Sequence, residues 1–70
     1  MSKTITVNIN GRPYSCKEQL TLYNLVTYLN FNPQLVAVEY NRRVISNNLL
    51  GSVKLKNEDS VEIVTIVGGG

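Results

Sequence analysis

The last three residues, Gly68-Gly69-Gly70, are the part of this 70-residue chain best suited to chemistry. Glycine packs no side chain and loses the most conformational entropy on ordering, so three in a row do not stabilise a fold. A tail without side chains can instead enter a narrow channel. There its terminal carboxylate can be activated as an acyl-adenylate, from which a sulfur nucleophile can displace AMP. The alternative is a frayed terminus or a cloning scar.

Catalysis by the chain itself is not expected. The sequence has no histidine, which excludes imidazole metal ligands and histidine acid–base catalysis, and no glycine-rich phosphate loop precedes a helix. Cys16, the single cysteine, is either a reactive or persulfide-carrying thiol or a small core residue on a strand. We therefore expect no catalytic residue, metal site or bound cofactor here, and we expect partner enzymes to act on the tail.

Composition narrows the setting in which the chain works. A hydrophobic content of 43% suits a folded domain, and a net charge of +2 is too small to indicate nucleic-acid binding. The largest basic cluster, Arg42-Arg43, either docks an acidic partner surface or lies in a solvated turn. One cysteine, no apolar signal segment and no membrane-length apolar run predict a bacterial cytoplasm or a plastid stroma.

The first elements that the sequence predicts are the two strands of a hairpin. Residues 4–9 alternate apolar and polar, as a half-buried strand does. Asn10-Gly11 predicts a tight turn into a second strand over residues 12–17. Pro13 places that second strand at an edge, because proline lacks a backbone N–H.

A helix is predicted next. Thr21 is a good N-cap, with Leu20 and Leu25 at the hydrophobic-staple positions on either side of it. Asn30 can adopt the left-handed conformation that ends a helix, and Pro33 prevents continuation. One apolar stripe runs along the helix: Leu22, Leu25, Val26 and Leu29.

The second half of the chain predicts three more strands. Residues 35–40 form a buried strand, Asn41-Arg42 a tight turn, and 43–45 a short strand. Residues 46–56 predict a loop or a single helical turn, and 61–67 predict the last strand. Four apolar residues are expected to anchor the irregular segment: Leu49, Leu50, Val53 and Leu55.

This order of elements predicts an α+β fold of the β-grasp, or ubiquitin-like, type. A mixed sheet of four to five strands is expected, with one helix packed across one face. A right-handed crossover would place the first and last strands parallel in the middle of the sheet. The domain is expected to span residues 1–67, followed by a flexible tail over 68–70.

A partner-docking surface is expected beside the tail. The alternation of the last strand is lost at Ile66 and Val67, which are both apolar. If these side chains lie outside the core, an exposed apolar patch next to the tail indicates a partner contact. The alternative is that they complete the core of a small protein.

Four segments of the sequence resemble a known family. They are the opening strand with Asn10-Gly11, Thr21-Leu22-x-x-Leu25-Val26, Val36-Ala37-Val38-Glu39-x-Asn41, and the stretch from Asp59 to Gly70 with its Val-Gly-Gly-Gly ending. Over its whole length the chain is similar to the ThiS family, the sulfur carriers of thiamine thiazole synthesis. One departure is Tyr40-Asn41-Arg42-Arg43, which replaces the Asn-Gly turn of many relatives.

The resemblance implies a mechanism and a set of partners. Gly70 would be adenylated by a ThiF-type enzyme that uses ATP and magnesium, and sulfur from a cysteine desulfurase would convert it to a thiocarboxylate. A ThiG-type thiazole synthase would then take the sulfur. Gly69 would be the second glycine of the family's Gly-Gly motif, and Gly68 would lengthen the arm.

Three other functions remain open from the sequence. The small subunit of molybdopterin synthase has the same fold and Gly-Gly end, and gives its sulfur to a pterin precursor. A ubiquitin-like modifier would use the tail to form isopeptide bonds with lysines. A plain β-grasp interaction module would make no use of the tail.

Overall fold

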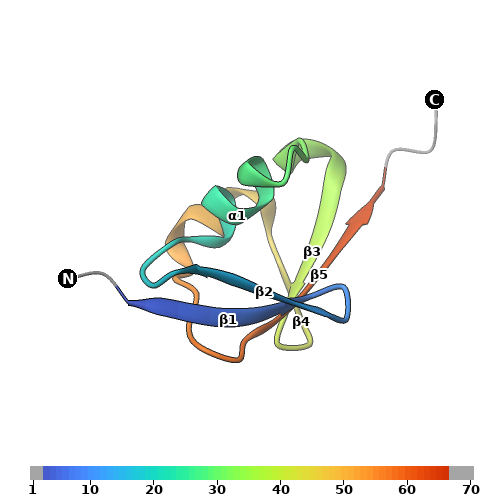
Figure 1. The fold of residues 1–70 in the computed structure, drawn as a ribbon. Coiled ribbons are helices and arrows are strands. Elements are labelled where there is room, and N and C mark those ends of the chain that lie inside the picture. The colour runs from blue at the N-terminus through green and yellow to red at the C-terminus, as the bar shows by residue number, and fades with distance from the viewer. Residues whose placement is uncertain (1–2, 67–70) are drawn as a thin grey trace.

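The computed structural model describes residues 3–66 of the chain. Along the sequence these residues form five strands, one α-helix and two 3-10 turns (Figure 1). The elements are β1 (Thr4–Ile9), β2 (Arg12–Lys17), α1 (Leu22–Tyr28), η1 (Pro33–Leu35), β3 (Val36–Tyr40), β4 (Arg43–Ile45), η2 (Asn47–Ser52) and β5 (Ser60–Thr65).

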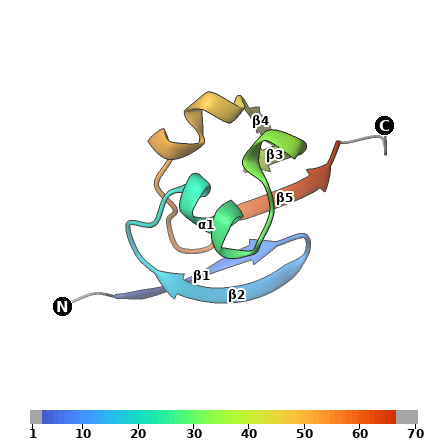
Figure 2. The ribbon, with the colours of Figure 1, turned by 90° about the horizontal axis from the view of Figure 1, so that it is seen from above.

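The strands form one mixed sheet in the order β2-β1-β5-β3-β4. β1 and β5 are parallel neighbours inside the sheet, as predicted, and the other neighbouring pairs are antiparallel. Figure 2 shows α1 lying across one face, between the β1–β2 hairpin and η2. The predicted β-grasp fold is therefore confirmed, with five strands.

The β1–β2 hairpin has the predicted tight turn. Asn10 and Gly11 both have left-handed backbones, with φ of 51° and 83°, as a type I′ turn requires. Pro13 pairs with Asn8, and β2 is an edge strand, so the missing proline N–H removes no bond to a neighbouring strand. The second hairpin turn has the same geometry, because Asn41 and Arg42 have φ of 48° and 72°.

The helix begins where its sequence predicts. The Thr21 hydroxyl accepts a hydrogen bond from the Asn24 N–H, and the Asn24 side chain accepts one from the Thr21 N–H, each at 3.1 Å. This capping box satisfies two N–H groups that the helix leaves unpaired. Asn30 follows with the expected left-handed φ of 68°. Among the described residues, no helix has the length and apolar character to span a bilayer.

The core lies between α1 and the inner face of the sheet. Three of the four stripe residues of the helix are buried, and the fourth, Leu29, packs against the core. The buried apolar residues are Ile5, Val7, Ile9, Leu22, Leu25, Val26, Val36, Val38, Leu50, Leu55, Val61 and Ile63.

Three predictions about individual residues were wrong. Leu35 lies in the η1 turn, not in β3, because Pro33 starts a 3-10 turn after the extended Asn32. Leu49 does not anchor the η2 segment; its side chain is 52% exposed, while Leu50 on the next position is fully buried. The last strand ends at Thr65, so Ile66 lies beyond it, and Val67 is outside the described residues.

Candidate functional site: the end of β5 and the outer face of the sheet

β5 is the strand from which the tail continues, and its two neighbours support it over different lengths. On one side β3 pairs with β5 from Val61 to Thr65. On the other side β1 pairs only with Ser60 and Val61, because β1 then turns into its hairpin. Beyond Val61, the backbone of β5 therefore needs another partner on the β1 side.

The side chain of Asn10 supplies that partner. Its Oδ1 accepts a hydrogen bond from the Ile63 N–H at 2.8 Å, and its Nδ2 donates to the Ile63 carbonyl at 3.3 Å. An amide side chain carries both a donor and an acceptor, so it can replace one residue of a neighbouring strand. Asn10 therefore extends the hydrogen bonding of β5 on its β1 side from Val61 to Ile63.

A second asparagine holds the start of β5. The Asn41 Oδ1 accepts a hydrogen bond from the Ser60 N–H, and the Asn41 N–H donates to the Ser60 carbonyl, each at 2.8 Å. The Asn41 Nδ2 also donates to the Asp59 carboxylate at 3.2 Å. Both hairpin turns of the sheet thus contribute an asparagine that bonds to the backbone of β5.

Asp59 is the buried polar centre of this region. Only 8% of its surface is exposed, and its carboxylate accepts hydrogen bonds from the Tyr40 hydroxyl and from the Lys56 N–H, the latter at 2.7 Å. Burial raises the pKa of Tyr40 to about 12, with further contributions from the hydrogen bond to Asp59 and from its charge. This network fixes the turn from which β5 begins.

The exit of β5 is exposed. The Ile66 N–H donates to the Leu35 carbonyl at 3.0 Å, so Ile66 keeps the pairing with the β3 side. Its side chain is 57% exposed, which confirms that it lies outside the core. The other predicted site residues lie outside the described part of the chain: Val67, Gly68, Gly69 and Gly70. The structure therefore describes the strand that leads to the tail, and the tail itself lies outside the described residues.

Apolar and acidic side chains share the outer face of β4, β3 and β5, opposite the helix. Alternation along β3 and β5 buries every second residue and turns the others to this face. Val44 is 73% exposed and Val64 is 58% exposed. A shallow hollow of about 70 Å³ lies between the side chains here, lined by Ala37, Val38, Glu39, Val44, Glu62 and Val64.

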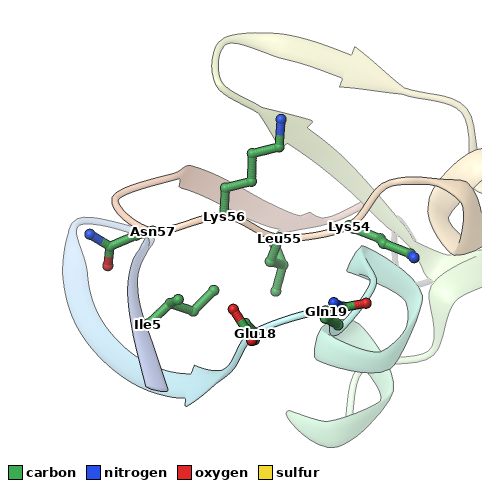
Figure 3. A pocket seen from close by; sticks show the side chains of 7 residues that line it. All are labelled: Ile5, Glu18, Gln19, Lys54, Leu55, Lys56 and Asn57. Carbon is green, nitrogen blue, oxygen red and sulfur yellow. The ribbon is translucent and has the colours of Figure 1, made fainter. Parts of the chain in front are cut away.

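A larger open pocket of about 430 Å³ lies at the other end of the sheet (Figure 3). Ile5 and Leu55 point into it together with the Glu18 carboxylate, whereas the side chains of Lys54 and Lys56 point away. The pocket adjoins the start of β1 and the segment that leads into β5. Because β1 and β5 are parallel, it lies far from the end of β5 that carries the tail.

Three other candidate residues contribute no chemistry to this geometry. Cys16 is half-buried and packs against the core, and burial raises the pKa of its thiol, which disfavours the reactive thiolate. Arg42 and Arg43 are exposed at the β3–β4 turn. Among residues 3–66 no group of three metal-ligating side chains could hold an ion.

Comparison with known proteins identifies the family to which this sheet and its tail belong. The ThiS family model matches residues 7–70, which include β5, its exit and the three glycines. The chain belongs to the ThiS family.

Relatives and solved structures agree with ThiS membership. The protein ycf40 of Porphyra purpurea is 43% identical over 70 residues, which are 100% of this chain and 99% of that protein. A thiazole synthase of Magnetococcus marinus is 39% identical over 64 residues, 91% of this chain but only 20% of that protein. The crystal structure of the thiamine biosynthesis protein ThiS of Geobacter metallireducens has a TM-score of 0.81 and 28% identity. The match covers 94% of this chain and 100% of the Geobacter metallireducens chain.

Proposed function

We propose that this chain is a sulfur carrier. Gly70 would be adenylated and converted to a thiocarboxylate, which donates its sulfur for thiazole formation in thiamine biosynthesis. The observation that carries the proposal is the ThiS family match, which spans residues 7–70 and so includes the three glycines. In this scheme a carboxylate oxygen of Gly70 attacks the α-phosphate of ATP and releases pyrophosphate. The outer sulfur of a persulfide, formed by the cysteine desulfurase, then displaces AMP from the acyl carbon. A thiol reductant cleaves the resulting acyl disulfide and releases the thiocarboxylate.

The partners follow from this chemistry. A ThiF-type adenylyltransferase would use ATP and magnesium, a cysteine desulfurase would supply the sulfur, and a ThiG-type thiazole synthase would receive it. Support for the last comes from the Magnetococcus marinus thiazole synthase, a protein that contains a segment similar to almost the whole of this chain. The name of the Geobacter metallireducens structure, a thiamine biosynthesis protein, supports the same pathway.

The glycine tail and the two residues before it would have different roles in binding the partner. Gly68 and Gly69 would thread the partner's active site because they have no side chains to obstruct a channel. Ile66 and Val67 would dock against the partner, and the exposed side chain of Ile66 supports this role. The ycf40 relatives come from the red algae Porphyra purpurea and Pyropia yezoensis, which favours a plastid stroma as the place of action.

Intact-mass measurement tests the proposal directly. The chain is incubated with a ThiF-type enzyme, ATP, magnesium, a cysteine desulfurase with cysteine, and a thiol reductant that supplies the two electrons for release of the thiocarboxylate. The mass should change by the replacement of one oxygen with sulfur. A variant lacking both Gly69 and Gly70, which no longer ends in Gly-Gly, is the control, and it should stay unmodified while melting at the wild-type temperature. An unchanged mass of the wild-type chain would refute the carrier function. Sulfur transfer to a ThiG-type synthase, compared with a molybdopterin synthase large subunit, identifies the acceptor.

A further inference from the structure

Two glutamates stand directly opposite each other on the outer face of the sheet. Glu39 of β3 pairs with Glu62 of β5, and both side chains are exposed. Like charges in directly opposed positions of neighbouring strands destabilise a sheet. Among the side-chain hydrogen bonds of residues 3–66, none involves Glu39 or Glu62.

Apolar side chains flank the two glutamates on the same face. Val44 is the cross-strand partner of Glu39 on β4, and Val64 follows Glu62 by one alternation along β5. Both glutamates and both valines line the hollow of about 70 Å³. Ile66 follows in the same alternation and leads toward the tail, so this surface is continuous with the exit of β5.

We propose that this outer face docks the enzyme that activates the tail. The partner presents one lysine or arginine to Glu39 and Glu62 together, surrounded by apolar side chains that cover Val44 and Val64. A cation between the two carboxylates removes their mutual repulsion and forms an ion pair with each of them. This inference rests on the proposed carrier function, and it names the surface and the charge by which the partner is recognised.

A second copy of this chain does not fit the same face. Two copies stacked through their outer faces would bring Glu39 and Glu62 of each against those of the other, and like-charge contacts across an interface oppose association. The acidic pair therefore selects a basic partner and opposes self-association. It also sets the orientation in which that partner binds, because Glu39 lies on β3 and Glu62 on β5, the strand that leads to the tail.

The test uses ATP–pyrophosphate exchange catalysed by the ThiF-type enzyme of the same organism, with this chain as the varied substrate. The Glu39→Gln/Glu62→Gln variant should raise the KM for the chain at least about tenfold and leave kcat within about twofold, as expected for loss of a close interfacial charge pair. Added salt should raise the KM for the wild-type chain more than the KM for this variant, because salt screens the charges that the variant lacks. Its melting temperature should equal or exceed that of the wild type.

A matched control removes the same number of charges at the other end of the sheet. Glu18→Gln/Glu58→Gln should keep the wild-type KM, since Glu18 lines the distant pocket and Glu58 precedes β5. Val44→Ser should raise the KM without altering the response to salt, because it removes apolar area and no charge.

The outcomes separate the two proposals. If the wild type supports Gly70-dependent exchange but the Glu39→Gln/Glu62→Gln variant keeps the wild-type KM, the docking surface is refuted and the carrier function stands. The same conclusion follows if the Glu18→Gln/Glu58→Gln control loses as much affinity as the test variant. If the wild type supports no exchange, the carrier function is refuted, and the docking inference falls with it.

Discussion

The hydrogen bonds of Asn10 to Ile63 can be measured by comparing two substitutions. Asn10→Gly keeps the left-handed backbone and removes both side-chain bonds, one at 2.8 Å and one at 3.3 Å. A hydrogen bond of ordinary length contributes about 1 kcal/mol net, and the bond at 3.3 Å adds little because it is longer than a usual N–H···O bond, so the pair contributes about 1 kcal/mol. Asn10→Ala removes the same bonds and also forces alanine to the φ of 51°, which costs about 1–2 kcal/mol more.

Urea denaturation is a suitable assay for these differences. A small domain loses about 1 kcal/mol of stability per molar urea, so Asn10→Gly should lower the midpoint by about 1 M and Asn10→Ala by about 2–3 M. A domain of this size has a total stability of only about 4–10 kcal/mol, so both shifts are large. Amide hydrogen exchange at Ile63 should accelerate in both variants, because the N–H loses its acceptor.

Asn30 provides the matched control. It also has a left-handed backbone, with φ of 68°, but among the described residues its side chain makes no recorded hydrogen bond. Asn30→Gly should therefore leave the urea midpoint unchanged or slightly higher, whereas Asn30→Ala should lower it by the backbone cost alone. If Asn10→Gly unfolds at the wild-type midpoint, the bonds to Ile63 contribute nothing and the reasoning is wrong.

Three further predictions concern the core, the exit and the buried tyrosine. Leu25→Ala should cost about 2–5 kcal/mol, because Leu25 is 3% exposed, and a near-neutral melting shift would show that it is not a core residue. Ile66→Glu should weaken binding of the activating enzyme, measured by titration calorimetry, while the melting temperature stays unchanged; unaltered affinity would exclude Ile66 from the interface. The pKa of Tyr40 rises from 10.0 to about 12 on folding, so its contribution to stability is complete below pH 10 and is lost as the pH rises toward 12. Tyr40→Phe should therefore lose less stability than the wild type over that interval, as measured by urea midpoints at each pH.

Local patterns in the sequence predicted most of the fold. The Asn10-Gly11 turn, the Thr21 cap and the apolar stripe of the helix each depend on residues within one or two turns of the chain. The parallel arrangement of β1 and β5 also followed, because one crossover direction is strongly preferred. The expectation that Leu49 anchors the irregular segment was wrong, because the adjacent Leu49 and Leu50 of the 3-10 turn take opposite environments.

The contacts around β5 could not be predicted in the same way. The Asn10 side chain bonds to a residue 53 positions away, and the opposition of Glu39 and Glu62 depends on the register between β3 and β5. A long connection does not fix such a register, and sliding by one residue would separate the two glutamates. In the sequence Asp59 stood out only as the first residue of the family-like stretch, and its burial and its hydrogen bond from Tyr40 became visible only in the structure. Asn10 and Asn41 were predicted only as turn residues, yet the side chains of both form hydrogen bonds with the backbone of β5.

The position of Asn10 along β5 bears on how a partner can pull on the tail. Ile63 is the last buried residue of the strand, and Val64, Thr65 and Ile66 are all exposed. Force applied beyond Ile66 therefore acts on the hydrogen bonds to β3 and on Asn10 before it reaches the core. Substitutions in the core should consequently lower the global stability alone. Substitutions at Asn10 should also weaken the attachment of β5, the strand that leads to Gly70.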